Sequence, residues 1–436
     1  PGESEQRKRV VVLGGGFGGL FFCKALRDRS LDVTLVDRQN HQLFQPLLYQ
    51  VATAGLESGD VCYSTRGIAR SLDTTRSIQG EVVSIDRTNR FVLTRDGLQL
   101  PYDSLVIAVG GVTADFGVEG VATHAFGLKS AAEAEALRDH LLTEFEAEAS
   151  RRIDGKGADP AATGIVIVGG GPTGVEMAGG YAELVARVLT SDYPEIPQTD
   201  TRVVLIEGQD RLLNGFADSL ADNAQRTLEK MGVEVILGEQ VAAVDAVSVT
   251  LGGGAAIPSK TVVWAAGIRA HPLAAALGCE TTRGGRIVVD EHLRLPDDPQ
   301  VHVIGDVAAS PIGPDEAGLA PQVAPGAIQG GQPVARLIAA TVAGDAGSME
   351  AFRYRDKGSM ATIGRHAAVV EMPNGWTIKG FPGWVAWLGL HLIMLVGFRN
   401  RASVLVNWAW NYLTYDRGSR SVIERDSRSE LTPQQG

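Results

Sequence analysis

Cysteine is scarce in this sequence. The 436 residues contain only Cys23, Cys62 and Cys279, and no two of them form a Cys-x-x-Cys motif or another close pair. This spacing excludes a redox-active disulfide between neighbouring cysteines and gives no indication of a zinc site or a disulfide framework. We therefore expect each cysteine to be a small, buried or half-buried apolar residue, and we expect no metal site.

Basic residues are fewer than acidic residues, which argues against a nucleic-acid partner. The chain has 40 Lys and Arg against 51 Asp and Glu, a formal net charge of −11. Residues 351–436 are an exception, because their 11 basic and 6 acidic side chains give a net charge of +5 and leave −16 for the rest. This basic end suggests contact with an anionic surface. The polar segment Pro1 to Arg9 has no apolar core, so we expect no signal peptide.

Glycine, by contrast, is plentiful, and two glycine-rich turns follow apolar strand-like runs and open helix-like segments. They are Gly14-Gly15-Gly16-Phe17-Gly18-Gly19 and Gly169-Gly170-Gly171-Pro172-Thr173-Gly174. In a GxGxxG turn, the first glycine permits the tight turn, the second lets the backbone approach a pyrophosphate, and the third lets the helix lie close to the strand. One such motif is often an ordinary turn, but two in this context predict two dinucleotide sites.

Each glycine turn is followed by the acid that the fingerprint requires to bind ribose hydroxyls. Asp37 and Glu207 each close an apolar strand, although Glu207 lies 36 residues beyond Gly171 because Thr190 to Thr201 is predicted to be an inserted loop. A carboxylate at position 207 accepts a ribose 2′-hydroxyl and repels a 2′-phosphate, so NADH is favoured over NADPH. The nearest base, Arg211, is the one residue against this preference.

Three further apolar strands end in glycine, and their order indicates how the domains are arranged. They are Leu105 to Gly111, Thr261 to Gly267, and Val301 to Asp306. The first two are places where the chain could pass between two nucleotide domains, so one domain interrupts the other. We predict an α/β fold with two Rossmann-like dinucleotide-binding domains and a C-terminal helical segment that associates with the membrane. The predicted boundaries are 1–115 with 285–350 for the flavin domain, 116–284 for the nicotinamide domain, and 351–436 for the membrane-anchoring region.

The chain resembles a known family over most of its length. Gly305-Asp306 at the end of a strand is similar to the second flavin motif of the two-dinucleotide-domain oxidoreductases, in which the Asp binds the ribityl chain. From about Arg9 to Arg417 the sequence resembles the type II NADH dehydrogenases, which are single-subunit NADH:quinone oxidoreductases that do not pump protons. The likeness is carried by Gln45-Pro46-Leu47-Leu48-Tyr49-Gln50-Val51-Ala52, Gly169 to Glu176, Ala324 to Gln329, Lys357 to Ala361 and the Trp-rich end.

This resemblance implies cofactors, substrates and a location. It implies FAD at the first glycine turn, NADH at the second, and two-electron reduction of a membrane quinone to quinol within a respiratory chain. It also implies a peripheral protein on the inner, cytoplasmic face of the cell membrane, in contact with lipid and with the quinone pool. Separately, the apolar C-terminal helices offer a surface through which the chain could form a homodimer. The implied FAD-binding residues are Gly14, Gly16, Phe17, Gly18, Gly19, Asp37, Gly110 and Asp306. The implied NADH-binding residues are Gly169, Gly171, Pro172, Thr173, Gly174 and Glu207.

Three side chains are candidates for catalytic roles by the same resemblance. Glu176, which we expect in the first turn of the second fingerprint's helix, matches a family glutamate tied to NADH binding and to proton delivery. A helix dipole alone would also favour an acid there. Lys357 matches a lysine near the flavin ring, where a cation stabilises negative charge, although it equally suits a charged surface run.

The third candidate, Gln329, matches the second Gln of the family's quinone-site pattern Ala-Gln-x-Ala-x-Gln. Pro325 stands where the first Gln is expected, and proline supplies neither an amide side chain nor a backbone N–H. Gln322 lies close enough in sequence to raise the question of substitution. A Gln on the surface of a helix is the alternative for Gln329.

Five of the six tryptophans lie between Trp376 and Trp410, around an 18-residue stretch without formal charge, Phe381 to Phe398. As one helix this stretch would be about 27 Å long, the lower limit for a membrane span. Its three glycines, its proline and His391 make it a poor span. Because Trp prefers the headgroup level and Arg binds anionic lipid, we predict one or two helices lying in the interface. A true span and a buried core or dimer helix are the alternatives.

Two other functions are compatible with two dinucleotide sites. A sulfide:quinone oxidoreductase shares this organisation, but its chemistry needs cysteines beside the flavin. A flavoprotein that signals through an NADH-dependent conformational change would turn over slowly, and turnover with a soluble quinone analogue distinguishes it from an enzyme.

Overall fold

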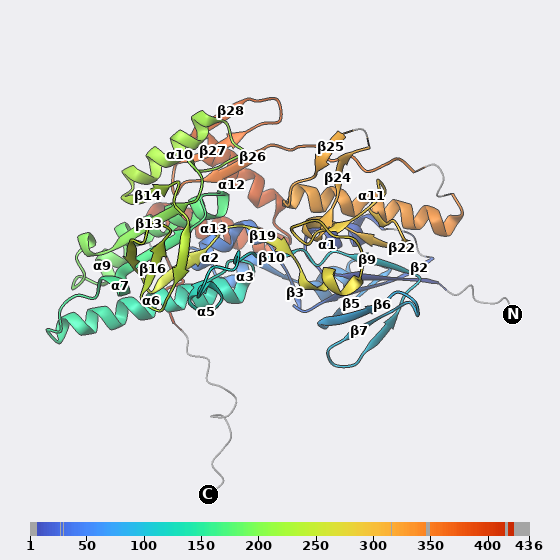
Figure 1. Ribbon diagram of the computed structural model, residues 1–436, viewed down its shortest axis with the longest axis horizontal. Coiled ribbons are helices and arrows are strands. Elements are labelled where there is room, and N and C mark those ends of the chain that lie inside the picture. Colours follow the sequence, from blue (N-terminus) through green and yellow to red (C-terminus); the bar gives the residue numbers. More distant parts are fainter. Residues whose placement is uncertain are drawn as a thin grey trace, which may run out of the picture.

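Two parallel sheets flanked by helices form two lobes that lie side by side (Figure 1). The computed structural model describes residues 7–26, 28, 30–314, 316–345, 349–414 and 417–422. The predicted α/β class with two dinucleotide-type sheets is confirmed. Most of the segment Pro1 to Arg9, and the basic residues after position 422, lie outside the described residues.

The first sheet has the strand order β21-β22-β9-β1-β2-β5. Its strands are β1 (Lys8–Leu13), β2 (Leu31–Asp37), β5 (Thr75–Gln79), β9 (Ser104–Ile107), β21 (Arg294–Leu295) and β22 (Asp298–Val303). All pairs except β21 with β22 are parallel, and Ile107 is in register with both Leu13 and Val303. The turns that follow β1, β9 and β22 therefore meet at one edge, where α/β sheets bind ligands.

The second sheet is entirely parallel, in the order β11-β18-β12-β13-β14. Its strands are β11 (Ala125–Phe126), β12 (Gly164–Val168), β13 (Arg202–Glu207), β14 (Val233–Leu237) and β18 (Thr261–Trp264). The central strand β12 is buried throughout, as expected for an apolar strand covered on both faces. Between the two sheets, β10 (Gly111–Thr113) pairs antiparallel with β19 (Ile268–Ala270), so the chain crosses between the lobes twice at the same place.

Helices and small antiparallel sheets complete the lobes. The main helices are α1 (Phe17–Ala25), α2 (Leu48–Ala52), α3 (Ser58–Val61), α6 (Ala131–Ile153), α8 (Pro172–Leu184), α10 (Asp218–Lys230) and α11 (Ala324–Ala343). The small sheets are β6 (Val82–Asp86) with β7 (Phe91–Thr94) and β8 (Gln99–Pro101), and β15 (Val241–Val244) with β16 (Ser248–Leu251) and β17 (Ala256–Pro258). A Cβ at Gly331 of α11 would lie 2.7 Å from the Gly18 carbonyl oxygen, so glycine permits the close packing of α11 on α1.

The predicted loop Thr190 to Thr201 is wrong at its start. After α8 the chain continues as a π-helical turn, Val185–Leu189, and as α9 (Thr190–Asp192). Val185, Val188 and Leu189 are buried, so apolar packing carries the helix past the point where the sequence composition becomes polar.

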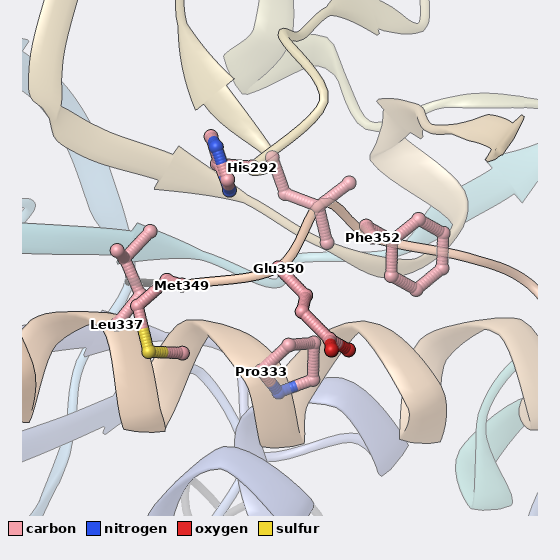
Figure 2. Close-up of a pocket in the computed structure, with 7 residues that line it drawn as sticks. His292, Pro333, Leu337, Met349, Glu350 and Phe352 are labelled. Carbon is pink, nitrogen blue, oxygen red and sulfur yellow. The ribbon is translucent and has the colours of Figure 1, made fainter. Parts of the chain in front are cut away.

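A segment that follows α11 crosses back over this helix. Figure 2 shows Met349, Glu350 and Phe352 above Pro333 and Leu337, with His292 on the far side. The hollow between them has a volume of about 10 Å³. A space of this size holds no more than one water molecule, so it is a packing defect and not a ligand site.

The C-terminal part begins with an antiparallel sheet and ends with two helices at the junction of the lobes (Figure 1). The strands are β26 (Ser359–Thr362), β27 (Ala368–Glu371) and β28 (Thr377–Gly380), and the helices are α12 (Phe381–Met394) and α13 (Phe398–Thr414). None of the helices in the described ranges combines the length and the apolar character that crossing a membrane requires.

Candidate functional site

The first glycine turn forms an open cradle at the start of α1. Gly14 has a φ of +100° and a Cβ there would collide with the Ala108 carbonyl, while a Cβ at Gly19 would collide with the Gly14 carbonyl. Gly16 differs, because its φ of −70° suits any residue and a Cβ would meet nothing within 4 Å. The space above Gly16 is therefore free, and this is what a pyrophosphate at a helix N-terminus needs.

The second glycine turn repeats this geometry at the start of α8. Gly169 has a φ of +110° against Ala265, and Gly174 lies against the Gly169 carbonyl. Gly171 has a φ of −70° and open space above it, as Gly16 has. Pro172 and Thr173 are exposed in the first turn of α8. The two cradles thus fit the same chemical group.

The carboxylates of Asp37 and Glu207 are bound to the glycine turns that precede them. Gly15 N donates to Asp37 Oδ2 at 2.6 Å, and Gly170 N donates to Glu207 Oε2 at 2.5 Å. A second backbone N–H follows each acid, from Gln39 to Asp37 and from Gln209 to Glu207. Each acid is therefore fixed at the edge of its cradle, where ribose hydroxyls are bound in this fold.

Arg211, the base that argued against a preference for NADH over NADPH, is bonded to other residues. Its guanidinium forms an ion pair with Asp218 and donates to the Phe216 carbonyl at 3.3 Å. Glu207 therefore has no cation paired with it among the described residues.

Asp306 lies in the turn after β22, at the edge of the first sheet where the turns after β1 and β9 also lie. Burial raises the pKa of the Asp306 carboxyl, whereas Lys129 and Arg286 lower it. Gln322 Nε2 donates to the Asp306 carbonyl at 2.8 Å and fixes the turn. Sequence reasoning missed Lys129 and Arg286, because nothing local relates them to Asp306. Gly110, with a φ of +73°, turns the chain after β9 at the same edge.

Glu176 is a buried acid on α8, and its predicted position is wrong by one turn. The first turn of α8 contains no acid, because the helix begins at Pro172 and Glu176 is its fifth residue. A helix dipole therefore explains little of its placement. Its Oε1 accepts a hydrogen bond from Thr362 N of β26 at 3.4 Å. Burial raises the pKa of Glu176 to about 8, so the carboxyl is protonated at neutral pH.

Aromatic side chains from two distant segments surround Glu176. Trp387 of α12 lies close enough to influence its pKa, and Glu176 in turn raises the pKa of the buried Tyr49 of α2. The rings of Tyr49 and Trp387 are 6.1 Å apart and meet edge to face. At the first glycine turn, the ring of Phe17 packs against that of Phe44 at 5.8 Å. The structure thus joins the second fingerprint's helix to the segment Gln45 to Ala52 and to the Trp-rich end.

Gln329 and Lys357 are related through one backbone segment. Gln329 Nε2 donates to the Arg355 carbonyl at 2.9 Å, and its Oε1 accepts from Arg355 N at 2.8 Å. Both ends of this amide are therefore used to hold the chain two residues before Lys357, whose side chain is exposed. Pro325 lies in the first turn of α11, where a missing N–H costs nothing.

The cysteines behave as expected from their spacing. Cys23 is buried, Cys62 and Cys279 are half-buried, and all three are free thiols. Burial raises the pKa of Cys23 to about 12 and that of Cys62 to about 11, so both remain protonated and poorly nucleophilic. The described residues include no group of His, Cys, Asp and Glu arranged to hold a metal ion.

Comparisons with known proteins agree with this geometry. Residues 8–331 match the family model of pyridine nucleotide-disulphide oxidoreductases, and residues 357–415 match the NDH2 C-terminal domain. The chain is 40% identical over 433 residues to the type II NADH:quinone oxidoreductase NdhA of Mycobacterium tuberculosis, covering 96% of this chain and 90% of that protein. It is 30% identical to the type II NADH:quinone oxidoreductase of Staphylococcus aureus, covering 84% and 90%.

Two solved structures share the fold at low identity. NDH2 of Plasmodium falciparum in complex with NADH has a TM-score of 0.86 at 19% identity, covering 96% of this chain and all of that one. The sulfide:quinone oxidoreductase of Aquifex aeolicus has a TM-score of 0.71 at 18% identity, covering 94% and 96%. At these identities the likeness concerns the fold alone.

Proposed function

The chain belongs to the type II NADH:quinone oxidoreductases. From this membership we propose which of its residues bind FAD and NADH and which take part in reducing the quinone. The enzyme oxidises NADH and reduces a quinone to the quinol with FAD as cofactor and without pumping protons. The observation that supports the residue assignments best is the pair of matching cradles, each with an open central glycine and a fixed acid.

We propose that the first cradle holds FAD and the second NADH. FAD, when bound, takes two electrons from NADH and passes them to the quinone. Gly16, Phe17 and the other residues of the first turn bind its pyrophosphate, Asp37 binds the ribose, and Asp306 with Gly110 holds the ribityl side. The NADH-binding residues are Gly169, Gly171, Pro172, Thr173, Gly174 and Glu207.

We propose that Glu176 supplies a proton to the quinone. A carboxyl with a pKa of about 8 is protonated at neutral pH and close enough to that pH to be an effective acid. Its position between α8, β26 and α12 keeps it away from bulk water. The role does not depend on the helix dipole, which was the alternative explanation for an acid in this helix.

Lys357 and Gln329 are proposed to act on the same side of the cofactor. The exposed cation of Lys357 favours negative charge on a bound ring. The amide of Gln329, which holds the backbone of Arg355, sets the position of Lys357. In this assignment Gln329 serves the quinone site by positioning, because both ends of its amide already have partners.

A reaction with sulfide is not proposed, although the fold is shared. That chemistry requires nucleophilic thiols beside the cofactor. Cys23 and Cys62 have raised pKa values, and no two cysteines pair.

We propose that the surface of α12 and α13 binds the inner, cytoplasmic face of the membrane. In a soluble helix the apolar face turns inward, but α13 does the opposite. Its polar side chains Asn400, Ser403, Asn407 and Asn411 bond to the lobe beneath. The exposed large apolar side chains of the two helices are Phe381, Val385, Leu390, Ile393, Phe398, Leu405, Val406, Trp410, Tyr412 and Leu413.

A patch of this kind marks an interaction site, and lipid is the partner that a lipid-soluble quinone requires. A homodimer through the same surface is the alternative outcome of a vesicle-binding test. We further propose the division into a flavin domain of residues 1–115 and 285–350, a nicotinamide domain of residues 116–284, and an anchoring region of residues 351–436. The strand order, in which β22 joins β1 and β9, supports this division.

The test is anaerobic stopped-flow absorbance at the flavin band, with NADH added first and a short-chain quinone second. Rapid bleaching followed by rapid recovery is expected. Gly16→Val and Gly171→Val are matched variants, because both backbones suit valine and both side chains would enter a cradle. The first should be purified without the flavin band, and the second should keep the band and lose at least tenfold in bleaching rate at low NADH. The opposite pattern would reverse the two assignments.

A further inference from the structure

Trp387 carries a buried hydrogen-bond donor that has no acceptor. Its side chain is 1% exposed, and its Nε1 has no hydrogen-bond partner among the described residues. A buried N–H without an acceptor is destabilising and calls for an explanation. Among the described residues, Glu176 lies within reach of this indole. The protonated carboxyl of Glu176 is a weak acceptor for the indole, whereas an ionised Glu176 would accept a stronger, charge-assisted hydrogen bond.

A second tryptophan is connected to the same place through a hydrogen-bond chain. Trp408 Nε1 of α13 donates to Gln50 Oε1 at 2.7 Å, and Gln50 Nε2 donates to the Tyr49 hydroxyl at 2.8 Å. Both ends of the Gln50 amide are used, so its orientation is fixed. The Tyr49 ring in turn packs against Trp387. Trp408 therefore holds Tyr49 against the indole that faces Glu176.

Among the described residues, the other charged and titratable groups that act on this cluster are Arg417, Glu183 and His391. Arg417 pairs with Glu183 at 3.1 Å, and both act on the pKa of Tyr49, Arg417 lowering it and Glu183 raising it. His391 stacks on Trp387 at 4.0 Å. Burial lowers the pKa of His391 to about 4, so it is neutral and brings no charge at working pH. Thr362 N is the remaining donor to Glu176.

We propose that Trp387 and the chain from Trp408 through Gln50 to Tyr49 are positioning residues for quinone reduction. The Trp387 N–H stabilises the Glu176 carboxylate that remains once the carboxyl has given up its proton, and the Trp408 chain keeps Tyr49 and Trp387 in place for this. Both tryptophans belong to the helices α12 and α13, so the proposed membrane anchor also forms part of the proton-donating site.

The step balances with the established reaction, in which NADH, one proton and quinone give NAD⁺ and quinol. NADH supplies the electron pair and one hydrogen of the quinol as a hydride. The O–H bond of Glu176 breaks as the other O–H bond of the quinol forms, and the carboxylate then takes up from the solvent the one proton that the reaction consumes. The inference rests on the proposed role of Glu176 as the acid.

The test follows the rate of quinone-driven recovery of the flavin band from pH 6 to pH 10, after reduction by NADH. The holoenzyme is compared with Glu176→Gln, Trp387→Phe, Trp408→Phe and Trp376→Phe. Trp376 is the control tryptophan, because it is 75% exposed and lies outside α12 and α13. The rate of bleaching by NADH, which needs no proton from Glu176, is measured for every variant.

In the unmodified enzyme the recovery rate should fall above about pH 8, where Glu176 loses its proton. Without the Trp387 N–H the carboxylate is less stable, so this fall should move at least about one pH unit higher in Trp387→Phe. Trp408→Phe should slow recovery several-fold and shift the fall in the same direction, while Trp376→Phe changes neither. Bleaching at saturating NADH should keep its rate in Trp387→Phe and Trp408→Phe, because the proposed role of both residues concerns the proton and not the electrons.

The outcomes separate this inference from the role on which it rests. If Glu176→Gln keeps the unmodified profile, Glu176 is not the acid and the inference fails with it, although the NADH:quinone activity stands. Suppose that the recovery rate of Glu176→Gln no longer falls near pH 8, while that of Trp387→Phe still falls at the same pH as in the unmodified enzyme. In that case only this inference is overturned, and the role of Glu176 as the acid stands. Should Trp387→Phe fail to fold, the comparison of Trp408→Phe with Trp376→Phe decides, and identical profiles for these two overturn the proposal.

Discussion

At the residue scale, Glu207 closes β13 with its carboxylate bonded to Gly170 N and Gln209 N. Changing it to Gln keeps an acceptor oxygen for Gly170 and removes only the negative charge. We expect Glu207→Gln to reduce the preference for NADH over NADPH about tenfold, since a hydrogen bond to a charged group contributes about 1.5–3 kcal/mol. Steady-state kcat/KM for both dinucleotides measures the change. An equal loss for both would show that Glu207 only supports the turn.

Protonation of His302 in β22 should make the free energy of unfolding depend on pH. Burial lowers the pKa of His302 to about 3, below the value of about 6.5 for an unfolded chain. The neutral imidazole is thus favoured in the fold, and its contribution is complete above pH 6.5 and is lost as pH falls toward 3. Between pH 7 and pH 5 this loss is about 2 kcal/mol in the free energy of unfolding.

Denaturant unfolding of His302→Leu at pH 7 and pH 5 tests this contribution. The variant should lose less stability on acidification than the unmodified chain, while His41→Leu, at a half-buried position, serves as the control. If His302→Leu and the unmodified chain lose stability equally between the two pH values, His302 is not the source of the acid sensitivity.

How far single residues could be predicted depends on how local their partners are. Asp37 and Glu207 follow from a spacing rule, because each binds the glycine turn one strand earlier. The surroundings of Glu176 could not be predicted this way, since Thr362 lies 186 residues along the chain. Gln329 shows the same limit, because its sequence pattern contains nothing about the Arg355 backbone that it binds.

At the scale of the element, α13 is attached to α3 by a seam of polar side chains centred on Asp60. Ser403 Oγ and Asn407 Nδ2 donate to the Asp60 carboxylate at 2.5 Å and 3.0 Å. Asp60→Ala would leave these donors without an acceptor, which costs about 1–3 kcal/mol each when buried. We expect a lower Tm and faster tryptic cleavage at Arg399 and Arg401.

The control for this change lies on the opposite face of the same helix. Val406 is 67% exposed, so Val406→Ser should leave Tm and cleavage unchanged while weakening vesicle binding. If Asp60→Ala behaves like Val406→Ser, the polar seam does not hold the helix.

The strands were more predictable than the C-terminal helices. Each nucleotide strand is an apolar run that ends in glycine or an acid, and the structure places the strands within a few residues of those runs. The apolar stretch Phe381 to Phe398, in contrast, is divided at Leu395 to Gly397. Gly397 has a φ of +89° and packs on Tyr63, a contact between distant segments that composition does not reveal.

At the scale of the whole molecule, the exposed apolar side chains of α12 and α13 predict how the enzyme partitions between water and lipid. Ile393, Phe398 and Leu413 are 69%, 87% and 77% exposed. Changing all three to Ser removes apolar surface without touching the polar seam or Trp387. Burial of one such side chain contributes about 1.5–3 kcal/mol, so the triple variant should bind vesicles at least a hundredfold more weakly.

Cosedimentation with vesicles of phosphatidylcholine and phosphatidylglycerol measures this partition. The triple variant should also separate turnover from membrane binding, because oxidation of NADH with a soluble quinone analogue does not require contact between these three side chains and lipid. We expect that activity to remain and activity with a vesicle-bound quinone to fall. If vesicle binding persists while a detergent-free dimer disappears, the apolar surface joins two copies of the chain and lipid is not its partner.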